Sequence, residues 1–197
     1  MKYPKCIMFL ALMAFSFMPL LSIACEEEHP LEELYLDTLN SDQVYLGGQQ
    51  LLIPAYAELF IETPIVTEMT TAGIYYLVQG TTVTEEIKGF TSNGAGRLTY
   101  TDITENRVAL VTASLSSWLP GEDTPAIIAY RMFINGEGDL ASTTADVISI
   151  GDSLDAMQMV SLVSLQPNDY LEIKVVSNVA NCSLNVITMS LTITTVD

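Results

Sequence analysis

The sequence predicts an all-β protein, a two-sheet antiparallel β-sandwich that follows a leader and a short tether. From residue 53 onward, segments that alternate apolar and polar residues recur at spacings of roughly 8 to 15 residues. Turn-forming glycine, proline and asparagine gather between these segments. After residue 40 no long helical periodicity appears. Together these observations favour a sandwich of short strands.

The two strands nearest the C-terminus carry the clearest alternation. The first, 169–177, alternates Leu171 and Ile173 with Glu172 and Lys174. In the second, 183–195, apolar residues occupy every second position and mostly hydroxyl residues stand between them. The apolar residues are Ile187, Met189, Leu191 and Ile193. Because a period of two is typical of strands with one buried face, we expect these four to face the core.

Seven further strands are predicted upstream, at 54–62, 71–79, 96–101, 106–116, 124–134, 144–150 and 155–165. The segments between them contain residues that tolerate unusual backbone angles, such as Asn135-Gly136 and Pro167-Asn168-Asp169. Some strands are apolar on both faces, as in Ala126-Ile127-Ile128-Ala129-Tyr130. The opposite sheet can cover only one face, so a partner subunit or covering loops must shield the other.

The N-terminus has the features of a secretory signal. Lys2 and Lys5 precede an apolar run that leaves through Ser22-Ile23-Ala24. The run approaches the ~20 residues that span a bilayer, but the cationic start, Pro19 and the small-residue exit favour cleavage. We therefore expect a signal peptide at 1–24, an acidic tether or short helix at 25–52, and the sandwich domain at 53–197.

Cys25 directly follows the small-residue exit. The stretch Leu21-Ser22-Ile23-Ala24-Cys25 resembles the lipobox of bacterial lipoproteins, although Ser22 departs from the larger aliphatic residue usual there. The resemblance implies lipidation of Cys25, which would tether the protein to a membrane, since each buried methylene contributes about 0.8 kcal/mol. The alternative is ordinary cleavage after Ala24, which leaves an unmodified cysteine. Nothing else in the sequence predicts membrane contact.

The chain is strongly acidic, with 24 Asp and Glu against 7 Lys and Arg and a formal net charge of −17. Removing residues 1–24 takes away two lysines and no acid, so the remainder carries −19. This charge repels nucleic acid and anionic lipid headgroups and excludes nucleic acid as a partner class. The acidity either keeps an apolar-rich exported protein soluble or serves to bind cations.

Residues suited to catalysis are scarce. His29 is the only histidine and belongs to the tether, which excludes a histidine-based triad and a multi-histidine zinc site on the domain. Cys25 and Cys182, the two cysteines beyond the leader, form no disulfide framework, and Cys182 lacks a domain histidine to activate it. The single tryptophan, Trp118, is expected to plug the core or its rim. We expect a protein that is not an enzyme.

Carboxylates in the predicted loops are the candidates for a calcium site. Oxygen clusters beside backbone carbonyls suit hard cations, although neither candidate loop has the spacing of an established motif. The candidate ligands are Asp152, Asp155, Glu137 and Asp139. The alternative is that these acids are simply solvated in turns, as we also expect for Glu85-Glu86 and Glu122-Asp123.

Several motifs taken together resemble one superfamily. Arg97 to Tyr100 after a glycine-flanked hairpin, Tyr130 to Gly136, and Val163 to Ile173 with its Asp169-Tyr170-Leu171-Glu172-Ile173 entry carry the similarity. They resemble the jelly-roll heads of the complement and tumour-necrosis-factor superfamily, as found in phage and bacterial fibre or surface proteins. The resemblance covers residues 54 to 197, and its motifs indicate the fold more strongly than the function.

The resemblance implies a ten-stranded jelly-roll β-sandwich that assembles as a homotrimer. With the export signal, it leads us to expect a non-enzymatic protein, secreted or anchored to the bacterial cell envelope, for adhesion, ligand binding or surface structure. One alternative is a virion-associated fibre or decoration protein, which the export signal opposes. Another is a carbohydrate-binding or carbohydrate-active sandwich domain, for which no constellation of residues speaks.

Overall fold

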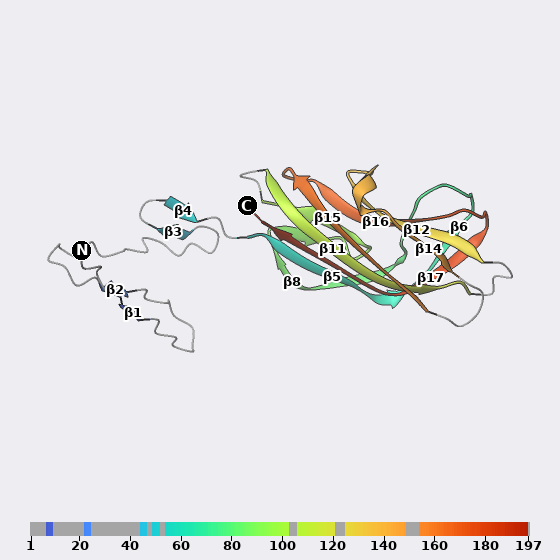
Figure 1. Cartoon of the computed structure of the whole chain (residues 1–197), viewed down its shortest axis with the longest axis horizontal. Coiled ribbons are helices and arrows are strands. Elements are labelled where there is room, and N and C mark those ends of the chain that lie inside the picture. Colours follow the sequence, from blue (N-terminus) through green and yellow to red (C-terminus); the bar gives the residue numbers. More distant parts are fainter. Residues whose placement is uncertain are drawn as a thin grey trace, which may run out of the picture. The chain divides into compact units, whose positions relative to one another are not determined.

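The computed structural model describes residues 54–102, 106–120, 125–148 and 154–196 in full, and the backbone of four short strands before residue 52. The chain divides into two compact units, Met1–Ile53 and Pro54–Asp197. Figure 1 labels most of the strands of the two units.

The first unit contains two pairs of three-residue strands. Strand β1 (Ile7–Phe9) pairs antiparallel with β2 (Ser22–Ala24), and β3 (Val44–Leu46) pairs antiparallel with β4 (Gln49–Leu51). The rest of the tether, where a short helix was one expectation, lies outside the described residues. In the described part of the chain, no helix has the length and apolar character needed to cross a membrane.

The second unit is built from strands and one 3-10 turn. Its elements are β5 (Tyr56–Pro64), β6 (Val66–Met69), β7 (Tyr76–Leu77), β8 (Gly80–Lys88), β9 (Phe90–Ser92), β10 (Arg97–Tyr100), β11 (Arg107–Trp118), β12 (Ala126–Ile134), β13 (Glu137–Gly138), η1 (Leu140–Ser142), β14 (Thr144–Ile148), β15 (Asp155–Leu165), β16 (Tyr170–Ser177) and β17 (Cys182–Thr195).

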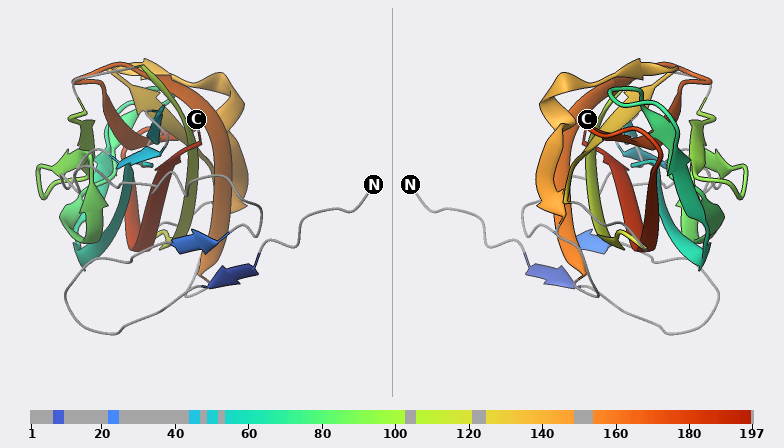
Figure 2. Two further views of the ribbon diagram at one scale, coloured as in Figure 1. Left: turned by 90° about the vertical axis from the view of Figure 1, so that its left-hand side faces the viewer. Right: turned by 90° about the vertical axis from the view of Figure 1, so that its right-hand side faces the viewer.

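These strands form two antiparallel sheets. The six-stranded sheet has the order β15-β11-β17-β5-β8, with β6 paired to the first half of β17. The seven-stranded sheet has the order β13-β12-β16-β10-β9, with β14 paired to β12 and β7 to β16. Figure 1 shows β5, β11, β15 and β17 running side by side, and Figure 2 views the two layers from their ends. The chain passes repeatedly from one sheet to the other, and from β14 to β17 it changes sheet at every connection.

The core lies between the sheets and explains the alternation in the sequence. In β11 and β15 nearly every second side chain is buried, and its neighbours are exposed or half-buried. Leu59, Leu171 and Ile173 are among the largest fully buried side chains. Burying one such side chain stabilises the fold by roughly 1.5–3 kcal/mol, so the pattern alone favours a two-layer sandwich. The predicted fold class, an all-β sandwich, is confirmed.

The turn after β12 has the backbone that its sequence predicts. Asn135 and Gly136 both adopt positive φ, of 53° and 85°, and Ile134 pairs directly with Glu137 across them. A two-residue hairpin with both central φ values positive matches the right-handed twist of its strands, and Asn-Gly is the favoured pair for it.

The predicted strand at 71–79 is wrong. Residues 71 to 73 form a turn in which Gly73 has φ 77°, and only Tyr76–Leu77 is extended as β7. The hydroxyl of Tyr76 is hydrogen bonded to the hydroxyl of Thr70 and accepts a hydrogen bond from the backbone N–H of Thr71. These local bonds compete with sheet pairing, so a run rich in β-forming residues becomes a turn.

Strand β8 is absent from the strands predicted from the sequence. The structure places Glu85 and Glu86 in this strand, whereas both were expected in a loop. The strand lies at the edge of the six-stranded sheet and pairs with β5 through two register shifts. Charged residues and irregular pairing are common on edge strands, where they discourage pairing with other chains, and they erase the period of two.

A β-bulge changes which face of β17 is buried. Ser116 pairs with Thr188 and Ser117 pairs with Val186, so Ile187 is an extra residue on β17. Val186 is therefore buried and Ile187 is only half-buried, contrary to the prediction that Ile187 faces the core. The prediction is correct after the bulge, for Met189, Leu191 and Ile193. One added residue reverses the parity of a strand.

Tyr130 links the two sheets through the core. It is fully buried on β12, and its hydroxyl donates a 2.8 Å hydrogen bond to Oγ of Ser117 on β11 of the opposite sheet. Burial raises the pKa of the Tyr130 hydroxyl well above its usual value, and the negative charge of Asp155 adds to the rise, while the bond to Ser117 opposes it. The folded protein therefore holds this phenol neutral.

We expect this buried phenol to weaken the fold in alkali. Above pH ~10 the unfolded chain loses the Tyr130 proton while the folded chain keeps it, so the free energy of unfolding falls by up to about 1.4 kcal/mol per pH unit. Urea unfolding from neutral pH to pH ~11 measures this loss. The variant Tyr130→Phe keeps the ring without the proton and should lose stability less steeply. Equal slopes for the two proteins would contradict the assignment.

Candidate functional site

The outward face of the six-stranded sheet is apolar where β11 and β15 run side by side. Val108, Leu110, Val160 and Leu162 are exposed there, Leu162 by 66% and Val160 by 60%. Leu110 lies directly opposite Leu162. We call these four residues the aliphatic face. Exposed apolar clusters of this kind mark surfaces that bind another molecule.

The surface beside the aliphatic face is polar but bears little charge. The outward positions of β17 carry Thr192 and Thr194, which pair with Thr112 and Leu110 of β11. Beyond β17, carboxylates appear on this face at Glu58 of β5 and Glu68 of β6. In a chain with 24 acidic residues, the uncharged outward positions of β11, β15 and β17 form a distinct surface. Depletion of charge is typical of the buried centre of an interface.

Strand β15 ends the six-stranded sheet and leaves one of its sides without a described strand of the same sheet. It is 11 residues long, has a charge only at Asp155, and contains no proline. Natural proteins usually protect such an edge with charges, proline or a bulge, because its backbone can pair with another chain. The edge and the aliphatic face together form a continuous surface suited to a second protein subunit.

The candidate calcium ligands do not converge among the described residues, where no group of three or more His, Cys, Asp or Glu side chains forms a cluster. The carboxylate of Asp139 accepts hydrogen bonds from the backbone N–H of Ala141, at 3.1 Å, and the hydroxyl of Ser161, at 2.6 Å. It therefore caps η1 and ties it to β15. Glu137 is exposed in the hairpin. Asp152 lies outside the described residues, so the calcium site stays a prediction.

Asp155 contributes a buried carboxylate oxygen that has no hydrogen-bond partner among the described residues. It begins β15, three residues after Asp152 in the sequence.

The other candidate residues considered in the sequence lie in different parts of the chain. Cys182 is fully buried at the start of β17 and Trp118 is half-buried at the end of β11, whereas Cys25 and His29 lie outside the described residues.

A second surface, on the outward side of the seven-stranded sheet, gathers positive charge on aromatic rings. The chain has five basic residues after residue 24, and three of them lie on this side. We call these cations and the rings beneath them the cationic face. Its members are Arg97, Arg131, Lys174, Tyr75, Phe133 and Tyr170.

Each cation lies over one ring. The Arg97 guanidinium carbon is 4.0 Å from the centre of the Tyr170 ring, that of Arg131 is 4.8 Å from the Tyr75 ring, and Lys174 Nζ is 4.6 Å from the Phe133 ring. The edges of Tyr75 and Phe133 also meet, with centroids 5.1 Å apart. Cations over aromatic faces are attracted by about 0.5–2 kcal/mol each, which fixes their positions.

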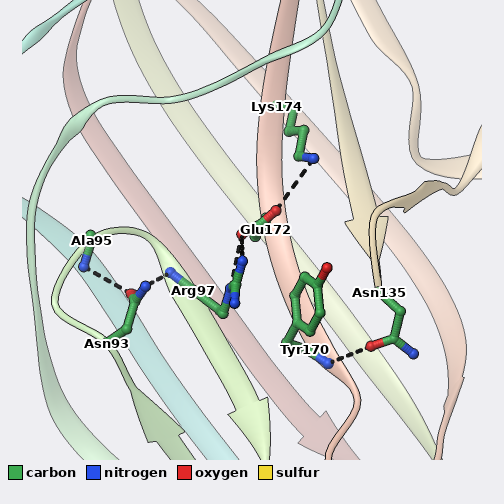
Figure 3. Close-up of polar contacts among 7 residues, drawn as sticks. All are labelled: Asn93, Ala95, Arg97, Asn135, Tyr170, Glu172 and Lys174. Carbon is green, nitrogen blue, oxygen red and sulfur yellow. Dashed lines mark hydrogen bonds and ion pairs between the residues drawn. The ribbon is translucent and has the colours of Figure 1, made fainter.

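Glu172 holds two of these cations together (Figure 3). Its Oε1 accepts hydrogen bonds from Nε and Nη2 of Arg97, at 2.9 and 2.6 Å, and its Oε2 lies 3.4 Å from Lys174 Nζ. The Glu172 side chain is only 6% exposed, against 40% for Arg97. A carboxylate buried on an outward face requires such partners, since an unpaired buried charge is costly.

The alternation in the sequence predicts that Glu172 and Lys174 share one face of their strand, but it does not reveal the cationic face. Arg97 and Arg131 come from separate segments and are brought beside β16 by strand pairing, and Tyr75 joins them through its ring contacts with Arg131 and Phe133. One signal in the sequence could have indicated this surface. Because basic residues are scarce in this acidic chain, each one that stands in a predicted strand is a candidate member of a binding surface.

No protein-family model and no curated protein matches the sequence. Solved structures do. Eiger TNF from S. frugiperda matches at a TM-score of 0.52 and 11% identity, over 74% of this chain and 94% of that chain. Murine APRIL, in the structure at pH 8.5, matches at a TM-score of 0.46 and 10% identity, over 73% of this chain and all of that chain.

The identities are far too low to carry function, which depends on individual residues. The sheets, their strand order and the likeness to Eiger TNF agree with the resemblance found in the sequence. The unit that begins at Pro54 therefore has the jelly-roll fold of TNF-like proteins.

Proposed function

We propose that this protein is a non-enzymatic surface protein whose jelly-roll unit assembles as a homotrimer and serves adhesion or ligand binding. The aliphatic face is the observation that carries the proposal. It leaves Leu162 and Val160 exposed on an uncharged sheet surface, and a second copy of the chain is the partner always present at matched concentration.

A ring fits this surface better than a two-fold dimer. The aliphatic face and the β15 edge are adjacent but different surfaces, one formed by side chains and the other by backbone. Contact between the edge of one copy and the face of the next is heterologous, and heterologous contacts form a ring when the rotation between copies closes and a filament when it does not. The trimer implied by the sequence resemblance is the smallest such ring.

Light scattering of the full chain at micromolar concentration tests the assembly. We expect three times the mass of one chain, because an interface that buries roughly 800 Å² per partner is stable at that concentration. A monomer at all concentrations tested would refute the trimer. A dimer would refute the heterologous arrangement.

We further propose that the chain is exported and anchored through an acyl group on Cys25. The support is the leader ahead of Cys25 and its lipobox-like ending. Replacing Cys25 with serine should move the protein from the membrane fraction to the soluble exported fraction, since it removes the site of acylation. Mass spectrometry of the N-terminal peptide measures the acyl mass directly. An unmodified Cys25 in the wild-type peptide would contradict the anchor.

A further inference from the structure

We propose that the cationic face binds a polysaccharide that carries carboxylate groups. The proposal concerns a surface within one subunit, on the sheet opposite to the aliphatic face. It goes beyond the proposed assembly and does not depend on it. Arg97, Arg131 and Lys174 are the residues proposed to contact the carboxylates.

The distribution of charge favours an anionic ligand on this face. Acidic residues exceed basic ones throughout the chain, yet three of the five cations after residue 24 share this face. Arg131 and Lys174 are directly opposite on paired strands, and Arg97 is opposite Glu172, two residues from Lys174. The three cations therefore follow one line across β12, β16 and β10. An anionic ligand is complementary to that line and to no other described sheet face.

The cations are also held in place before any ligand binds. Arg97 is fixed by Glu172 and by the Tyr170 ring, and the Nε of Arg131 donates a 2.8 Å hydrogen bond to the Thr143 hydroxyl. Held guanidinium groups lose little entropy on binding, and the terminal N–H groups that Glu172 and Thr143 leave over can donate to a ligand carboxylate.

Two asparagines fix the loops beneath this arrangement (Figure 3). Asn93 Oδ1 accepts hydrogen bonds from the backbone N–H groups of Ala95 and Arg97, which sets the turn leading into β10. Asn135 Oδ1 accepts a 3.0 Å hydrogen bond from the backbone N–H of Tyr170. Both ends of the Arg97 and Tyr170 contact are therefore anchored to the sheet.

The pairing of the strands decides which class of anion fits this face. Strands β12, β16 and β10 all have partners on both sides, so their backbone groups are already paired. An extended acidic peptide gains much of its affinity by adding a strand to an open sheet edge, which this face does not offer. Side chains alone recognise the ligand here. A sugar acid matches them, because its carboxylates meet the cations and its hydroxyls meet the hydroxyls of Tyr75 and Tyr170.

The test measures binding of the full chain to a short oligogalacturonate near 0.15 M salt, where the screening length of about 8 Å limits repulsion from distant acids. An uncharged oligosaccharide of equal length and a glutamate peptide of equal charge are the comparison probes. We expect the oligogalacturonate to bind more tightly than either. The double variant Arg131→Gln, Lys174→Gln should bind it roughly a hundredfold more weakly, because each lost charged hydrogen bond removes about a factor of ten.

Lys88→Gln is the matched control, since it removes one positive charge from the edge strand β8, outside the cationic face. It should keep nearly full affinity. Thermal unfolding of each variant checks its fold. If the double variant unfolds, Arg131→Gln alone replaces it in the binding test, because Arg131 forms neither of the ion pairs of Glu172. Absence of oligogalacturonate binding, or an equal loss in Lys88→Gln, would overturn the site. Equal or tighter binding of the peptide would overturn the choice of polysaccharide.

Discussion

Replacing Leu162 with aspartate is expected to convert the proposed trimer into monomers. Leu162 is the most exposed member of the aliphatic face and lies opposite Leu110. In the trimer each copy would bury a carboxylate against apolar side chains, which costs several kcal/mol per site. Since about 1.4 kcal/mol changes an equilibrium tenfold, the dissociation constant should rise by at least about a hundredfold. Light scattering over a dilution series measures the change.

The same substitution at Ile74 provides a control. Ile74 is 52% exposed in the turn before β7 and belongs to no strand of the aliphatic face. Ile74→Asp should leave the trimer intact, because its carboxylate stays in water. A trimer that survives Leu162→Asp unchanged would place the subunit contact elsewhere. Far-ultraviolet circular dichroism confirms that both variants keep their strands.

Replacing Tyr130 with alanine is expected to cost about 3–5 kcal/mol of unfolding free energy. The ring fills the space between the sheets and is fully buried. Its removal leaves a cavity in the core and takes the hydrogen bond from the buried Ser117 hydroxyl. Because a domain has a total stability of about 5–15 kcal/mol, this loss is a large fraction of the free energy of unfolding. Urea unfolding at neutral pH measures the loss.

The variant Tyr130→Phe separates the ring from its hydroxyl. It keeps the packing and removes the bond to Ser117, so it should cost only about 1 kcal/mol. If the two variants lose similar amounts, the hydrogen bond rather than the ring dominates at this position. That result would revise the role given to Tyr130 in joining the sheets.

Strand patterning explains which parts of the fold could be predicted. In β15 the period of two is unbroken and one face is buried, so the sequence predicts both its extent and its core side chains, whereas in β16 the outward Glu172 is also buried. At β8 a charged edge removes the pattern, and at Ile187 one inserted residue reverses it. Such features depend on neighbouring strands, which a local pattern does not describe.

The candidate surfaces were also only partly predictable from the sequence. The sequence indicated that some strands needed a second cover, and the structure places the exposed aliphatic residues on paired strands β11 and β15. Nothing in the sequence indicated that Arg97 would lie on Tyr170 or that Glu172 would hold two cations. Those contacts join residues far apart in the chain.

By itself, therefore, the sequence determined the sandwich, most strand positions, the leader-like N-terminus, and the scarcity of residues suited to catalysis. Only the tertiary structure decided which outward residues share a surface, because that depends on strand order and register. A strand's own pattern reports whether each side chain faces the core or the solvent. Its neighbours in the sheet, such as Leu162 beside Leu110 and Arg131 beside Lys174, are set by pairing between distant segments.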